Sequence, residues 1–256
     1  MRLVAWGRIM PISSSADPFG LHGAVVLVAG GTSGIGRAIA VAFSAQGARV
    51  TVTGATEAEV AASRHALPDL VAVPLDLQDH DGVARFMSGL AGLDHLINAA
   101  GIIRRGAEHD PAVFDQVIDI NLSGTMRMCT LARPFLAMTK GSIINMASML
   151  SFFGGGLVPG YAASKGGIAQ LTKSLAIAYA SDGIRVNAIA PGWIETPLTQ
   201  DLRDDPARSL AVLARTPMGR WGKPEDIAGP AVFLASPLAG FITGAVLVVD
   251  GGYLVT

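Results

Sequence analysis

Tyr161 and Lys165 are the residue pair with the clearest chemical potential, and they stand four positions apart in a segment of helical pattern. That spacing puts both side chains on one face of a helix. A nearby ammonium group favours the phenolate, so it would lower the pKa of the tyrosine from its usual value of about 10. The pair therefore predicts a proton-transfer residue that works near neutral pH, although a single pair at this spacing is more often exposed or used in packing.

A glycine-rich loop, Gly30-Gly31-Thr32-Ser33-Gly34-Ile35-Gly36, separates a predicted strand from a predicted helix over residues 37–46. Glycine has no Cβ atom, so the backbone can approach a pyrophosphate closely, and the free N–H groups of a helix N-terminus attract an anion. A structural turn would explain any one glycine. The order of strand, loop and helix instead indicates a phosphate-binding site.

The elements that must position these residues alternate along the chain. Short apolar runs rich in β-branched residues are separated by longer segments of helical period, which is typical of βαβ units and a parallel sheet. Because the runs are apolar throughout, we expect helices on both faces of the sheet. The seven predicted strands are residues 25–29, 49–53, 70–74, 95–99, 142–146, 185–190 and 245–249.

Several helix ends can also be recognised. Thr56 with Glu59 makes a capping-box pattern for a helix that runs toward residue 67, and Pro224 suits a helix first turn. No linker divides the chain after residue 22, so we expect one Rossmann-like, doubly wound α/β domain over residues 23–256. Residues 1–22 are expected to be a loosely ordered extension, in which either Met1 or Met10 could be the true start.

Composition excludes several classes of function. With 19 basic and 20 acidic residues and a formal net charge of -1, the chain has no electrostatic footprint for nucleic acid or an anionic membrane. None of its apolar stretches approaches the roughly 20 residues that span a bilayer. The five histidines never stand at ligand spacing, so no metal site is expected. The single cysteine, Cys129, cannot form an internal disulfide, which suits a cytoplasmic protein. The balanced charge favours a small-molecule substrate.

Seven motifs in register resemble the short-chain dehydrogenase/reductase family over about residues 22–253. They are the glycine loop, Asp76-Leu77, Asn98-Ala99-Ala100-Gly101, Asn121, Ser148, the Tyr161/Lys165 pair and Pro191-Gly192. The resemblance implies an NAD(P)(H)-dependent oxidoreductase that moves a hydride between nicotinamide and an alcohol or ketone. It also implies a catalytic role for each of four residues. Ser148 would polarise the substrate oxygen and Tyr161 would transfer the proton. Lys165 would lower the tyrosine pKa and hold the nicotinamide ribose, and Asn121 would support a water-linked proton route.

Cofactor choice is expected to depend on the end of the second strand, where an acidic residue binds the ribose 2′-hydroxyl and a basic one favours a 2′-phosphate. Here the residues are Gly54-Ala55-Thr56. They leave room for a phosphate to which Thr56 could donate, so the sequence slightly favours NADP(H) over NAD(H). The expected cofactor-binding residues are Gly30, Thr32, Ser33, Gly34, Ile35, Gly36, Gly54, Thr56, Asp76, Leu77, Asn98, Ala99, Ala100, Gly101, Tyr161, Lys165, Pro191, Gly192, Ile194 and Thr196.

A finer resemblance concerns the substrate. The segments at 102–105, 148–152 and 219–222 are similar to those of family members that act on sugar acids, such as gluconate and 2-deoxygluconate dehydrogenases. A substrate carboxylate needs a cationic partner, so Arg104 and Arg105 are candidates. Alternatively, both are solvated loop charges or pair with Glu108 and Asp110. Phe152 and Trp193 are further candidate substrate residues, and residues 192–217 would form a mobile lid.

Two other functions stay open. A 3-oxoacyl-carrier-protein reductase would share the fold and the motifs, and it would offer a basic docking face to its acidic carrier. A non-catalytic nucleotide-sensing protein would not need Ser148, Tyr161 and Lys165 together. In the family, the long helices, here at about 111–136 and 161–180, pack against copies of themselves, so we also expect a homotetramer.

Overall fold

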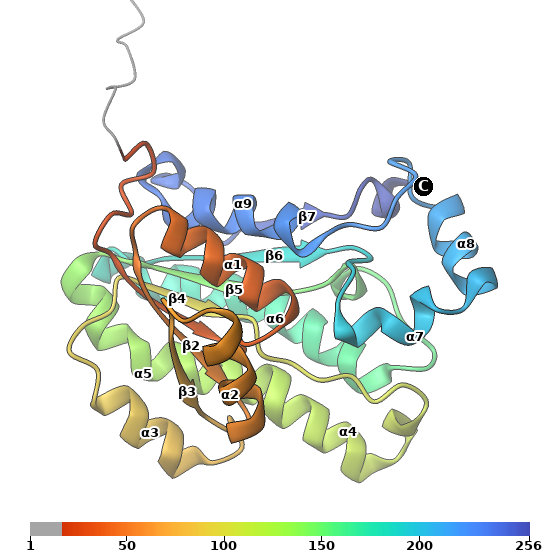
Figure 1. Cartoon of the computed structure of the whole chain (residues 1–256), viewed down its shortest axis with the longest axis horizontal. Helices are drawn as coiled ribbons and strands as arrows, with labels where there is room; N and C mark the ends of the chain where they lie inside the picture. Colours follow the sequence, from red (N-terminus) through yellow and green to blue (C-terminus); the bar gives the residue numbers. More distant parts are fainter. Residues whose placement is uncertain (1–16) are drawn as a thin grey trace, which may run out of the picture.

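A parallel sheet of seven strands runs through the centre of the computed structural model, which describes residues 17–256 (Figure 1). The strand order is β3-β2-β1-β4-β5-β6-β7, so the winding reverses between β1 and β4. Such a reversal opens a crevice at the carboxyl ends of the strands. The strands are β1 (Val25–Ala29), β2 (Arg49–Gly54), β3 (Val71–Pro74), β4 (His95–Asn98), β5 (Ser142–Met146), β6 (Arg185–Pro191) and β7 (Val246–Val249). The predicted sheet is confirmed, and each predicted strand end agrees with the observed one to within one residue.

Helices cover both faces of the sheet, because strands that are apolar throughout must be buried on both sides. One face carries α1 (Gly34–Ala45), α2 (Glu57–Ala66) and α9 (Pro224–Ala235). The opposite face carries α3 (His80–Ser88), α4 (Pro111–Ile118), α5 (Gly124–Thr139) and α6 (Pro159–Tyr179). Two short helices, α7 (Gln200–Arg203) and α8 (Pro206–Ala214), project from the body at the right of Figure 1.

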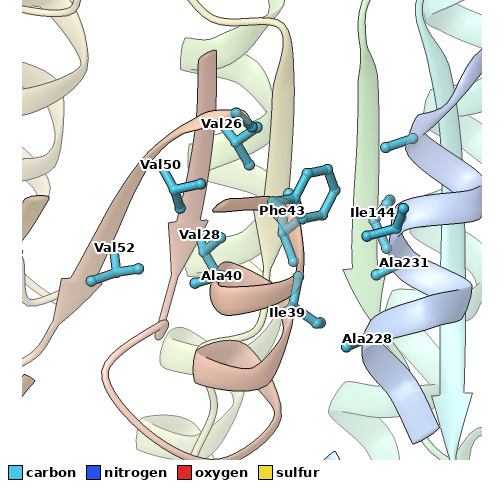
Figure 2. Packing of buried hydrophobic residues seen from close by; sticks show 14 of the residues in the cluster. Val26, Val28, Ile39, Ala40, Phe43, Val50, Val52, Ile144, Ala228 and Ala231 are labelled. Carbon is cyan, nitrogen blue, oxygen red and sulfur yellow. The ribbon is translucent and has the colours of Figure 1, made fainter. Parts of the chain in front are cut away.

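The side chains of β1 alternate between two hydrophobic cores, since successive residues of a strand point to opposite faces. Val26 packs with Ile39 and Phe43 of α1, and Figure 2 shows both α1 side chains facing α9, where Ala231 leaves room for them. Leu27 lies instead in the core beneath α3, α5 and α6. The strand that leads into the glycine loop is therefore held from both sides.

The predicted helix ends are partly confirmed. Thr56 caps α2, and its hydroxyl accepts a hydrogen bond from the Glu59 amide at 3.2 Å. The Glu59 carboxylate, however, accepts from the Ala55 amide at 2.9 Å and not from Thr56, so the capping box is displaced by one residue. The helix expected at about 111–136 consists of α4 and α5 joined by a π-helical turn, Asp119–Ser123.

The first residues that the structure describes belong to the packed domain. Leu21 is fully buried in the core beside α1, and the Asp17 carboxylate accepts hydrogen bonds from the Leu21 and His22 amides. For residues 17–22 the expectation of a loose extension is therefore wrong. Met1 and Met10 lie outside the described residues.

Within residues 17–256, none of the helices combines the length and the apolar character needed to cross a membrane. The same range contains no group of three or more His, Cys, Asp or Glu side chains that could hold a metal ion.

Candidate active site

Ser148, Tyr161 and Lys165 meet in one cavity at the carboxyl ends of β5 and β6. Ser148 follows β5 and begins a short 3-10 turn, while the other two residues occupy the first turns of α6. The Ser148 hydroxyl interacts with the Tyr161 phenol and lowers its pKa, against the larger effect of burial. Lys165 Nζ lies 5.5 Å from the centroid of the Tyr161 ring. The structure thus brings together three of the four predicted catalytic side chains.

Lys165 is buried, and its ammonium group donates to the backbone carbonyl of Met146 at 2.6 Å. This contact ties α6 to the end of β5. Burial disfavours the charged form and lowers the pKa of Lys165 to about 8. The lysine is therefore still mostly charged at pH 7, but it loses its proton at a lower pH than an exposed lysine does.

Tyr161 does not have the lowered pKa that its spacing to Lys165 predicts. Burial is the main cause, and it raises the pKa of Tyr161 to about 12. The interaction with Ser148 and the positive charge of Arg105 lower the pKa, whereas the negative charge of Glu108 raises it further. The expectation is wrong here because desolvation of the phenol outweighs neighbouring charges, and because the Lys165 ammonium is directed at Met146.

Asn121, the fourth predicted catalytic residue, is fully buried in the π-helical turn and does not line the catalytic cavity. Its Oδ1 accepts from the Ile102 amide at 2.8 Å, and its Nδ2 donates to the Ile102 carbonyl at 2.9 Å and to Ser164 Oγ at 3.1 Å. The side chain therefore fastens the loop after β4 to α6. Its part in a water-linked proton route stays a prediction.

A second cavity runs along the glycine loop and continues into the first, with which it shares Ile35, Ala99, Gly101, Thr196 and Leu198. This cavity keeps its shape because several of the loop residues that line it are glycines, which have no side chain. A Cβ atom on Gly30, whose φ is +75°, would lie 2.5 Å from Ala100 Cα, and one on Gly36 would lie 2.2 Å from the Gly30 carbonyl oxygen. Ser33 makes no side-chain cap to α1, so the first amides of α1 are open to an anionic ligand. These residues fit a dinucleotide, whose nicotinamide supplies or accepts the hydride when bound.

Most of the predicted cofactor residues line this continuous cleft. They are Gly30, Thr32, Ser33, Gly34, Ile35, Gly36, Gly54, Asp76, Leu77, Ala99, Ala100, Gly101, Tyr161, Lys165, Pro191, Gly192, Ile194 and Thr196. Thr56 and Asn98 do not line it. Thr56 caps α2, and Asn98 lies beneath the cleft, where its Nδ2 donates to Asn145 Oδ1 at 2.9 Å and contacts Cys129 Sγ at 3.3 Å.

Glu59 was missed as a cleft residue. Its carboxylate lines the cleft at the end of β2, and a Cβ on Gly54 would lie 3.1 Å from Glu59 Oε2. The capping-box pattern was the only sequence signal, and it indicated a helix end. A carboxylate thus occupies the region where the sequence showed only small residues.

Both candidate arginines are exposed. Among the described residues, the guanidinium of Arg104 donates one hydrogen bond, to the carbonyl of Ile103 at 3.4 Å. Desolvation and the Arg208 charge lower the pKa of Arg105, which also interacts electrostatically with Asp201 and Tyr161. Within the described residues neither arginine forms an ion pair with Glu108 or Asp110.

The other candidate substrate residues lie outside the catalytic cavity. Phe152 is 53% exposed. Trp193 packs edge-on against Trp221 at 5.9 Å and against Tyr253 at 6.2 Å, and it lines a neighbouring cavity with Met218. The proposed lid contains α7 and α8, and Leu202 and Val212 from these helices form an apolar cluster with Trp221. That this segment moves stays a prediction.

Comparison with known proteins identifies the family of this chain. A family model described as enoyl-(acyl carrier protein) reductase matches residues 29–254. The chain belongs to the short-chain dehydrogenase/reductase family, and it is an NAD(P)-dependent oxidoreductase acting on CH–OH groups. The resemblance seen in the sequence motifs is confirmed.

Several individual relatives have a named activity. A 2-dehydro-3-deoxy-D-gluconate 5-dehydrogenase of Pseudoalteromonas atlantica is 42% identical, over 93% of this chain and 98% of that protein. A crystal structure from Agrobacterium tumefaciens, described as a 2-deoxy-D-gluconate 3-dehydrogenase with bound NADP, is 43% identical, with a TM-score of 0.85 over 94% of this chain and all of that one. A 3-oxoacyl-[acyl-carrier-protein] reductase of Thermotoga maritima is 37% identical over 92% of this chain and 99% of that protein.

Proposed function

We propose that the enzyme interconverts a secondary alcohol and a ketone of a sugar acid, with Tyr161 as the proton-transfer residue. The observation that carries this proposal is the cavity lined by Ser148, Tyr161 and Lys165, which continues into a cleft that fits a dinucleotide. The names of the relatives at 42% and 43% identity support the substrate class.

Each side chain has one task in this proposal. Ser148 Oγ holds the substrate oxygen beside the Tyr161 phenol, which lines the same cavity. In reduction, Tyr161 donates its proton to that oxygen, and a pKa of about 12 keeps the phenol protonated at neutral pH. In oxidation, Tyr161 accepts the proton, and the Arg105 charge favours the phenolate.

Arg105 is the proposed partner of the substrate carboxylate. It interacts electrostatically with Tyr161 and with Asp201 and Arg208 of the lid region, which supports a place for its guanidinium close to the reacting centre. A desolvated carboxylate without a partner is costly, and a guanidinium can bind one with two hydrogen bonds. Arg104 is exposed like Arg105, but its guanidinium donates to the carbonyl of Ile103.

Glu59 is the proposed determinant of cofactor preference. The small residues at 54–56 leave space for a 2′-phosphate, and one relative binds NADP, but a carboxylate beside Gly54 would repel a phosphate and could accept from a ribose 2′-hydroxyl. We therefore infer that the enzyme prefers NAD(H). The small residues at 54–56, taken alone, predict a slight preference for NADP(H).

A homotetramer is the proposed assembly. Large apolar side chains are exposed on the two helices through which the family associates, namely Met126 and Met138 on α5 and Ile177 on α6. Burying such side chains between copies would remove apolar surface from water.

Turnover tests the function directly. We expect NAD(P)H absorbance to change with one or more sugar acids, and much less with neutral polyols or with acetoacetyl thioesters. Tyr161→Phe should lower kcat by at least about two orders of magnitude, while nucleotide binding, followed by fluorescence, survives. Full turnover in the variant would refute the role of Tyr161. A clear preference for acetoacetyl thioesters would favour the carrier-protein reductase instead, and binding without any turnover would favour a nucleotide sensor.

A further inference from the structure

Glu108 is a buried carboxylate that the proposed mechanism does not use. It is 1% exposed, and it lies in the short 3-10 helix Ala107–His109 between β4 and α4. Carboxylates are almost never buried to this degree without partners. Within residues 17–256 no cation forms an ion pair with Glu108. Its partners are backbone amides.

The two carboxylate oxygens hold two different segments of the chain. Oε1 accepts from the Arg104 amide at 2.7 Å, and Oε2 accepts from the Tyr161 amide at 2.7 Å. The first segment carries Arg105, and the second is the first turn of α6, which carries the proton-transfer tyrosine. One side chain therefore bridges the proposed carboxylate-binding loop and the catalytic helix.

The position of Glu108 also suits its charge. Val158, which precedes α6, makes no side-chain cap, so Glu108 supplies from another segment an acceptor for an amide of the first turn. A negative charge at a helix N-terminus is stabilised by the helix dipole. The same loop is joined to the α6 approach by two further hydrogen bonds, from Gly106 N to the Leu157 carbonyl at 2.7 Å and between His109 Nε2 and the Gly156 carbonyl at 2.9 Å.

Space for the carboxylate comes from a glycine in α6. A Cβ on Gly160 would lie 3.3 Å from Glu108 Oε2 and 3.2 Å from Phe114 Cδ2. Both contacts are tighter than ordinary packing, so an alanine here would push on the carboxylate from the α6 side.

We propose that Glu108 is a positioning residue, which fixes the Arg105 loop relative to Tyr161 and so sets where the substrate carboxylate lies when the proton is transferred. The proposal rests on the roles given above to Tyr161 and Arg105. The groups that face the phenol are Ser148 after β5, Lys165 of α6, and Glu108 and Arg105 of the loop after β4. Glu108 and Arg105 act in opposite directions on the acidity of Tyr161, so removal of the carboxylate should also be visible in the pH dependence.

The test variant is Glu108→Gln, which keeps the size of the side chain but has only one acceptor oxygen for two amides. Asp110→Asn is the matched control, since Asp110 is an exposed carboxylate two residues away that caps α4 by accepting from the Ala112 and Val113 amides. For both variants, kcat and KM would be measured with a sugar acid and a neutral polyol, together with the pH profile of oxidation and the thermal midpoint.

We expect Glu108→Gln to lower kcat with both substrates by roughly tenfold or more, and to raise KM for the sugar acid alone by a similar factor. The pH midpoint of oxidation should fall, because the phenolate loses a nearby negative charge. Asp110→Asn should stay within about twofold of the parent enzyme in kcat and KM. Should Glu108→Gln fail to fold, Gly160→Ala tests the same contact with the charge kept, and it should lower kcat without moving the pH midpoint.

Three results would overturn the proposal. The first is a Glu108→Gln enzyme that behaves like Asp110→Asn. The second is an equal loss on both substrates in kcat and KM with an unchanged pH midpoint, which would reduce Glu108 to a structural cap. The third, where Glu108→Gln does not fold, is full activity of Gly160→Ala. The underlying roles are checked separately with Tyr161→Phe and Arg105→Met. If those variants lose their activities while Glu108→Gln does not, only the positioning proposal fails.

Discussion

Arg220 and Asp226 form a two-pronged ion pair, in which the guanidinium donates to both carboxylate oxygens, at 2.7 and 3.0 Å. Asp226 also accepts from the Lys223 amide at 2.7 Å, so the pair joins the turn after the lid to the first turn of α9. The turn at residues 219–222 has a sequence similar to that of sugar-acid dehydrogenases, and here it stabilises the fold. The charge of Arg220 is paired with Asp226 of the same chain.

The Arg220–Asp226 pair predicts a pH-dependent contribution to stability. The guanidinium, followed by the Lys223 amide, lowers the pKa of Asp226 to about 2 from a usual value of 3.8. The folded-state pKa lies below the unfolded one, so the contribution is present above about pH 4 and is lost as the pH falls toward 2. Because the side chains are 47% and 34% exposed, we expect only about 1 kcal/mol. Urea unfolding of Asp226→Asn and the parent should differ at pH 7 and converge at pH 2. A difference that stays constant over this range would contradict the assignment.

Glu59→Gln should raise the affinity for NADPH by roughly tenfold relative to NADH, since the substitution removes a negative charge from the region of the ribose. Glu57→Gln is the matched control, because Glu57 is an exposed acid of the same helix turn that does not line the cleft. Dissociation constants from nicotinamide fluorescence give the measurement without turnover. Gly54→Asp would be a poorer test, because its Cβ would lie 2.8 Å from Thr32 Cγ2. If Glu59→Gln and Glu57→Gln bind the two cofactors in the same ratio, Glu59 does not determine the choice.

Arg105→Met should raise KM or lower kcat/KM for a sugar acid by roughly tenfold or more, about 1.4 kcal/mol, with little effect on a neutral polyol. Arg104→Met serves as the control, because Arg104 is also exposed but its guanidinium donates to the carbonyl of Ile103. A loss that is equal for both substrates would indicate a structural role for Arg105. No loss from either variant would leave the substrate carboxylate without its proposed partner.

Light scattering at micromolar concentration should report a mass of about four chains. The prediction depends on the exposed apolar residues of α5 and α6, and Ile177→Lys on α6, where the side chain is 81% exposed, should weaken the assembly. Far-UV circular dichroism checks that the variant still folds. A monomer from the parent chain would exclude the tetramer.

The features that could be predicted from the sequence are those that depend on neighbouring residues along the chain. The strand ends agree because each apolar run is bounded by turn residues, and Tyr161 and Lys165 share a helix face because a spacing of four residues requires it. The predictions that failed depend on neighbours brought by the fold. Tyr161 is desolvated by its surroundings, which outweighs Lys165. The burial of Glu108 between two distant segments has no local signature. Leu21 is part of a core whose other members, such as Ile39 and Phe43, come from other parts of the chain.

Cys129, the only cysteine in the chain, is fully buried beneath the cleft beside Asn98, and burial raises the pKa of its thiol to about 12. Thiol reagents attack the thiolate, so the native protein should be inert to them. Labelling then requires α5 to separate from the sheet, so the rate of thiol labelling would report how often that local opening occurs. Without any engineering, the enzyme carries a chemical reporter placed under the floor of its own nucleotide site. A ligand that binds in the cleft and stabilises the native state should therefore lower the rate of Cys129 labelling.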